Sequence, residues 1–72
     1  GLWAVRTKFK CQEIANTEWN QRVTLKPITG GSTENDEFFH TTPSGLIELT
    51  IKNPDVKFEV GKNYYVDFTS AE

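Results

Sequence analysis

The chain has 72 residues, a formal net charge of −2 and a single cysteine, Cys11. This length allows one domain, spanning residues 1–72, with a small core. One cysteine and one histidine supply neither a disulfide nor the roughly four ligands of a structural zinc site. No apolar run approaches the roughly 18 residues of a membrane span, and we expect no membrane partner.

Residue usage favours strands over helices. Val, Ile and Thr number 5, 4 and 9, whereas Ala, Leu and Met number 3, 4 and 0. β-Branched side chains suit a pleated, half-buried surface better than a helix. The composition therefore predicts an all-β protein.

Alternating polarity predicts two strands near the N-terminus. From Trp3 to Cys11 the odd-numbered residues are apolar, Thr or Cys, and the even-numbered ones are mostly cationic, which indicates a strand with one buried face. A turn at residues 15–17 would lead into a second strand that ends near Pro27. Its buried face would consist of Trp19, Gln21, Val23 and Leu25. We expect the two strands to form a hairpin.

The middle of the chain predicts a loop and one short helix. Gly30 and Gly31 indicate the loop, and Ser32 or Thr33 can cap a helix over residues 34–39. The acidic residues of its first turn would complement the helix dipole. Phe38 and Phe39 would place the end of this helix over an open end of the sheet.

The C-terminal part predicts further strands. Residues 46–51 would form a strand whose inward residues are Ile47, Leu49 and Ile51. Residues 56–60 and 63–69 would form a closing hairpin, with positive φ at its glycine, Gly61. In its second strand the inward residues would be Tyr64, Val66 and Phe68, and the outward ones Tyr65 and Asp67.

Four or five short strands of this kind favour a small closed sheet. Curling into a barrel buries one face and removes exposed edges. We therefore expect a small antiparallel OB-like or SH3-like β-barrel, with one short helix between the second and third strands.

Two segments resemble a known group of proteins. TPSGLIELTIKNP at residues 42–54 and FEVGKNYYVDF at residues 58–68 are similar, in order and spacing, to small uncharacterised proteins encoded by tailed bacteriophages. The resemblance implies a viral origin and an accessory or virion role, in the host cytoplasm or the virion. It implies no activity and no binding residues.

Two groups of residues raise the question of chemistry. Cys11 and His40 are the available pair of nucleophile and general base. Cys11, however, falls on the apolar face of its strand, where cysteine is usually a core residue. Glu34, Asp36 and Glu37 offer carboxylates to calcium, but their spacing lacks the twelve-residue calcium loop, and a role as acids at the helix N-terminus explains them more simply. We expect no catalytic residue, no metal, no cofactor and no enzymatic activity.

Cations on the outward faces of the first two strands are the binding candidates. A positive groove with aromatic platforms is typical of single-strand nucleic-acid binders. The candidate set, which we call the basic stripe, is Arg6, Lys8, Lys10, Arg22, Lys26 and Tyr65. An ordinary solvated strand face is the alternative interpretation.

Charge is divided unequally along the chain. Residues 1–28 carry five cations and two acids, and residues 29–72 carry three cations and eight acids. Opposite charge on the two halves favours self-contact or an anionic partner. We expect a phage-related structural or accessory protein whose partners are itself or other virion proteins. Single-stranded nucleic-acid binding through the basic stripe is the alternative.

Overall fold

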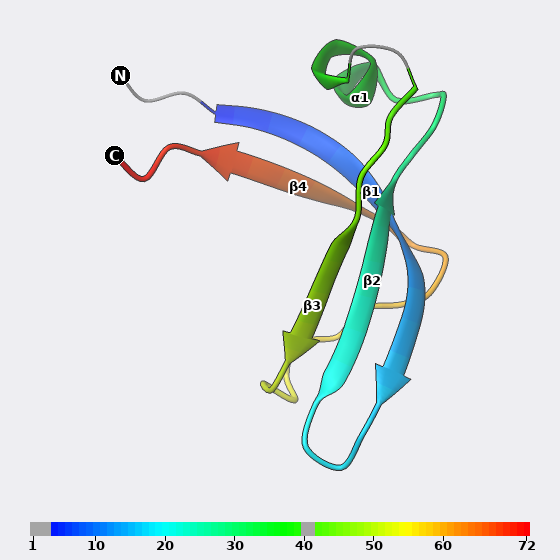
Figure 1. Cartoon of the computed structure of the whole chain (residues 1–72), viewed down its shortest axis with the longest axis vertical. Helices are drawn as coiled ribbons and strands as arrows, with labels where there is room; N and C mark the ends of the chain where they lie inside the picture. Colours follow the sequence, from blue (N-terminus) through cyan, green and yellow to red (C-terminus); the bar gives the residue numbers. More distant parts are fainter. Residues whose placement is uncertain (1–3, 40–41) are drawn as a thin grey trace.

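The computed structural model describes residues 4–39 and 42–72 and shows a mainly β chain (Figure 1). The elements are β1 (Ala4–Asn16), β2 (Gln21–Pro27), α1 (Thr33–Phe38), β3 (Ile47–Ile51) and β4 (Asn63–Thr69). The strands form one antiparallel sheet in the order β3-β2-β1-β4, curled into a half-barrel. The expected small antiparallel barrel class, with its helix between the second and third strands, is confirmed.

Strand β1 organises the sheet because it pairs with two partners along its length. Its first half pairs with β4 and its second half with β2, and the two pairings overlap only at Phe9 and Lys10. The register with β2 shifts between Cys11 and Glu13, so one residue is bulged there. The bulge turns Ile14 onto the core side. In Figure 1, β1 curves and β4 diverges from β2 and β3.

The core lies on the inner face of this half-barrel. Its buried apolar residues are Phe9, Cys11, Val23 and Leu25. Thr7 on the same face is fully buried, and its hydroxyl donates to the Val66 carbonyl over 2.9 Å. The predicted inward face of the first strand is therefore confirmed for residues 7, 9 and 11, whereas Trp3 lies outside the described residues.

One buried side chain, Asn35, ties α1 to the sheet. Pro27 ends β2, and beyond it the Ile28 N–H donates to the Lys8 carbonyl over 3.1 Å. The Asn35 amide enters the ladder at this point. Its Oδ1 accepts from the Lys8 N–H at 2.7 Å, and its Nδ2 donates to the carbonyls of Lys8 at 2.7 Å and Ile28 at 3.0 Å. A side-chain amide thus takes the place of a strand peptide group.

Ser32 fixes the orientation of this helix. Its hydroxyl accepts from the Asn35 N–H, so the expected N-cap is confirmed. The Phe38 ring at the end of α1 stacks on Phe68 of β4, with centroids 6.2 Å apart and ring planes 7° apart. The helix therefore contacts both strands of the β1–β4 pair, through Asn35 at Lys8 and through Phe38 at Phe68. His40 lies outside the described residues.

The predicted closing hairpin is wrong. Residues 56–60 form no strand, and β4 pairs with β1. The segment 52–62 crosses behind β2 and β1 in Figure 1 and places Phe58 against the core. Gly61 has φ +88°, as expected, and its N–H donates to the Cys11 carbonyl over 2.8 Å. The glycine turn therefore directs β4 onto β1. The prediction failed because the alternating pattern indicates which face of a strand is buried and does not indicate which strand it pairs with.

Two further residues predicted to face the core are more exposed than expected. Phe68 is 42% exposed beside Phe38, and Leu49 is 39% exposed on β3. Both residues belong to strands at the ends of the sheet, and β3 and β4 are not hydrogen-bonded to each other within the described residues. Within residues 4–39 and 42–72 the sheet therefore keeps two unpaired edges, at β3 and at β4.

We predict that Asn35→Asp lowers the free energy of unfolding by at least about 2 kcal/mol, because a carboxylate cannot donate to two buried carbonyls and adds a buried charge. Urea denaturation followed by circular dichroism measures the change. Asn16→Asp is the matched control, since Asn16 is exposed. Equal effects of the two substitutions would contradict the role assigned to Asn35.

Candidate functional site

On the outer face of the sheet, two cations of the basic stripe, Arg6 and Lys8, lie over the ring of a third member, Tyr65. Lys8 lies opposite Tyr65 in the β1–β4 pairing. The Arg6 Cζ lies 4.5 Å from the centroid of the Tyr65 ring, and the Lys8 Nζ lies 5.2 Å from it. These distances are typical of cation–π contacts. The outward position predicted for Tyr65 is confirmed, with 54% of the residue exposed.

Acidic neighbours neutralise part of this cluster. The Arg6 guanidinium donates to both oxygens of Asp67, over 2.8 and 3.0 Å. These hydrogen bonds and the positive charge of Arg6 lower the pKa of Asp67. The Lys8 ammonium lies 3.9 Å from a Glu34 oxygen. Two of the five cations of the basic stripe therefore already have internal partners.

The remaining cations of the basic stripe form no single group. Lys10 and Lys26 are directly opposite each other in the β1–β2 pairing, and both are exposed. Arg22 lies further along β2, opposite Ala15 on one side and Thr50 on the other. The outer face thus holds a ring cluster, a lysine pair and a separate arginine.

Trp19 corrects the prediction for the second strand. β1 continues to Asn16 and β2 begins at Gln21, so the predicted turn at 15–17 is displaced to residues 17–20. Trp19 lies in this turn and is 76% exposed. The Thr17 hydroxyl accepts from the N–H groups of Trp19 at 3.2 Å and Asn20 at 3.0 Å. The indole is therefore exposed on an ordered turn.

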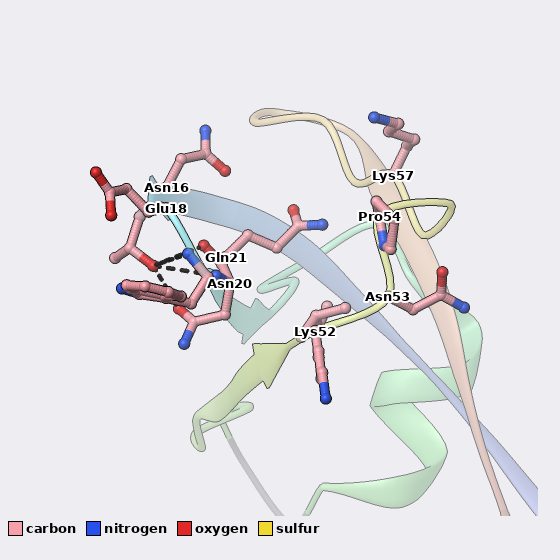
Figure 2. A pocket seen from close by; sticks show the side chains of 11 residues that line it. Asn16, Glu18, Asn20, Gln21, Lys52, Asn53, Pro54 and Lys57 are labelled. Atoms are coloured by element: carbon pink, nitrogen blue, oxygen red, sulfur yellow. Dashed lines mark hydrogen bonds between the residues drawn. The ribbon is translucent and has the colours of Figure 1, made fainter.

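Beside this turn lies a polar pocket of about 390 Å³ (Figure 2). One rim is the β1–β2 turn and the other is the segment that follows β3. In Figure 2, Asn16, Glu18 and Asn20 lie across the opening from Lys52 and the residues after it, with Gln21 between. The lining residues are Asn16, Thr17, Glu18, Trp19, Asn20, Gln21, Ile51, Lys52, Asn53, Pro54 and Lys57.

Hydrogen bonds within the rims determine which polar atoms remain for a ligand. The Gln21 Nε2 donates to the Val56 carbonyl over 2.8 Å and so joins the two rims. The Oδ1 of Asn53 accepts from the Asp55 N–H at 2.9 Å, and that of Asn20 accepts from the Thr17 hydroxyl at 3.1 Å. The amide nitrogens of Asn20 and Asn53 are left as donors beside the ammonium groups of Lys52 and Lys57, and the Glu18 carboxylate is an acceptor in the same lining. The pocket therefore offers donors from both rims, two cations and one acid.

Sequence reasoning missed this pocket for a physical reason. Its two rims are about thirty residues apart in the chain, and only the β2–β3 pairing brings Gln21 opposite Ile51. Each rim by itself has the composition of an ordinary turn. The exposed Trp19 was the available signal, but the alternating pattern assigned it to the core.

Cys11, which was considered for catalysis, packs in the core, and Glu34, which was considered for metal binding, lies at the start of α1. Cys11 is 1% exposed within the core. The Glu34 Oε2 accepts from the hydroxyls of Ser32 at 3.3 Å and Thr33 at 3.1 Å, at the start of α1. Among residues 4–39 and 42–72, no three His, Cys, Asp or Glu side chains form a group that could hold a metal ion. No helix in this part of the chain has the length and apolarity needed to cross a membrane.

Comparison with protein-family models, curated proteins and solved structures finds no match to this chain.

We predict that Asp67→Asn makes the loss of stability in acid shallower. The pKa of Asp67 is lower in the folded state, so its contribution is full above the unfolded value of about 3.9 and is lost as pH falls through the folded value. Urea denaturation at neutral pH and below about pH 4 measures this difference. Asp55→Asn, in an exposed turn, is the control. An acid slope unchanged by Asp67→Asn would contradict the prediction.

Proposed function

We propose that this chain is a non-enzymatic structural or accessory module of a phage-related assembly, which associates with copies of itself through the free edge of β4. The phage-related setting rests on the resemblance of residues 42–54 and 58–68. The observation that supports self-association is the free edge itself, which lies beside an apolar groove. Other virion proteins are the alternative partners for the same edge.

The backbone of β4 has groups available for another strand. Cys11 on β1 bonds toward the β4 side, where its N–H donates to the Lys62 carbonyl over 3.0 Å. Lys8 bonds toward the opposite side, through Asn35. Because these directions alternate along an antiparallel pair, the N–H and C=O groups of Tyr65 and Asp67 point away from β1. An added strand could bond to them without breaking a bond within the sheet.

An apolar groove of about 500 Å³ lies between β4 and β3. Ile47 and Leu49 line it from β3, Tyr64 and Val66 from β4, and Phe58 from the crossing segment. A strand added to β4 would continue the curled sheet toward β3 and place its inward side chains on this groove. Burial of such surface is the main favourable term in association.

The charge pattern of β4 favours a second copy as the added strand. In an antiparallel pair centred on Tyr65, the Asp67 of each copy would lie opposite Asn63 of the other. No like charges oppose each other in this register, and Asp67 is already paired with Arg6. The same patch would meet itself about a two-fold axis, as in most protein dimers.

The non-enzymatic part of the proposal is supported by the position of the single thiol. Nucleophilic catalysis needs a group that the substrate can reach. Cys11 packs among Phe9, Val23 and Leu25, and its N–H and carbonyl are bonded to the turn before β4. It therefore serves the core.

We predict a concentration-dependent dimer in size-exclusion chromatography with light scattering. Tyr65→Lys should yield a folded monomer, because two lysines would oppose each other at the centre of the interface. Thr50→Lys, which adds the same charge at the exposed edge strand β3, should leave the dimer intact. A wild-type monomer at high concentration, or equal effects of both variants, would refute association through β4.

A second candidate function is binding of single-stranded nucleic acid on the outer face. The juxtaposition of Lys10 and Lys26 favours it, because two exposed cations side by side can follow a phosphate backbone. The ring of Tyr65 lies on the same face.

We predict for this candidate that the protein retards a single-stranded oligonucleotide in a gel at low salt and releases it at high salt. Lys10→Ala/Lys26→Ala should abolish the retardation, whereas Lys62→Ala, which removes an exposed lysine outside the basic stripe, should not. Free migration of the oligonucleotide at low salt would contradict this function.

A further inference from the structure

An exposed tryptophan on an ordered turn is the starting point. Trp19 is 76% exposed, the highest fraction among the exposed large apolar residues of the described chain. Tryptophan has the largest apolar surface of any side chain, and leaving it in water forgoes the stabilisation that burial provides. The Thr17 hydroxyl holds its N–H and that of Asn20, so the ring is carried on fixed backbone. Such a ring is suited to stacking against a ligand.

The chemistry around this ring selects the ligand. Lys52 and Lys57 line the same pocket, with Glu18 as the one acid among the lining residues, so the lining has a net charge of +1. The amide nitrogens of Asn20 and Asn53 are available as donors, because the oxygens of both amides already accept hydrogen bonds. Donors and positive charge beside an aromatic face match a ligand with a flat ring and several acceptor oxygens.

We infer that this pocket binds a nucleotide unit, free or within a single nucleic-acid strand, with the base on Trp19 and the phosphate at Lys52 and Lys57. The volume of about 390 Å³ lies within the range of small-molecule sites, about 300–1,000 Å³. Bases stack on aromatic side chains with little sequence preference, and lysines supply the charge that follows the phosphates. A neutral sugar would also stack on an indole, but it would leave the two ammonium groups without an anion.

This site is separate from the surfaces described above. Gln21 and Ile51 in the pocket lie on the inner face with the core residues, whereas the basic stripe lies on the outer face. The free edge of β4 contributes no residue to the pocket. Binding at this pocket therefore depends neither on self-association nor on the lysine pair of the outer face.

Fluorescence anisotropy of a labelled oligodeoxythymidylate, with thymidine monophosphate and maltotriose as competitors, tests the inference. Trp19→Ala should weaken binding about tenfold and Trp19→Phe should restore part of it, because stacking needs an aromatic face. Lys52→Ala/Lys57→Ala should flatten the salt dependence by about 1.4 in the logarithmic slope, at about 0.7 per phosphate contact. All three side chains are on the surface, and circular dichroism checks that each variant folds.

Lys62→Ala is the matched control, since it removes an exposed lysine that belongs neither to the pocket nor to the basic stripe. This variant should bind the oligonucleotide with the affinity and salt dependence of the wild type. Competition by thymidine monophosphate supports a site for one nucleotide, and binding of the oligonucleotide alone supports a site for a strand. Binding that depends on Lys10 and Lys26 but not on Trp19 would overturn the inference, as would displacement by maltotriose alone or no binding at low salt. Light scattering on the same samples reports self-association separately.

Discussion

The half-barrel depends on the buried amide of Asn35. β2 ends at Pro27, and although the Ile28 N–H still donates to the Lys8 carbonyl, the Lys8 N–H on the same side needs an acceptor from outside the strand. A side chain from α1 meets this need, since Asn35 accepts from Lys8 and donates to Lys8 and Ile28. The helix is therefore attached to the sheet by hydrogen bonds of defined geometry. The described residues include four buried apolar side chains, Phe9, Cys11, Val23 and Leu25, so this polar contact contributes much to fixing where the helix and Phe38 lie.

The alternation of polarity predicted what lies on each face better than which strands pair. It placed Phe9, Cys11, Val23 and Leu25 in the core, because a period of two specifies the side of a strand. Helix capping by Ser32 and positive φ at Gly61 also followed from local chemistry. The strand that pairs with β4 could not be predicted from local chemistry, since β1 and residues 56–60 both have a suitable pattern of apolar residues. Pairing is a long-range choice, and the turn at Gly61 makes it.

For the candidate sites, too, the sequence predicted what depends on local pattern and did not predict what depends on contacts between distant segments. The basic residues of β1 were correctly placed on one outward face, but the acids that neutralise two of them come from β4 and α1. The prediction for Trp19 was wrong because it extended the alternating pattern to Trp19, two residues before the first residue of β2. The polar pocket beside it depends on the pairing of β2 with β3, for which neither turn carries a local signal. The candidate sites of this fold therefore depend on edges and turns, whose neighbours come from distant parts of the chain, more than on the faces of single strands.

The two-partner role of β1 has a consequence for the order in which the chain folds. The β1–β2 hairpin joins neighbouring segments, whereas the Arg6–Asp67 contact spans 61 positions. Closing such a loop costs more entropy, so contacts of this length slow folding. On the ribosome, β1 and β2 emerge well before β4, and one edge of β1 stays open in the interval. During that interval the open edge exposes unpaired backbone groups, which is the condition under which strand edges aggregate, until β4 pairs with it.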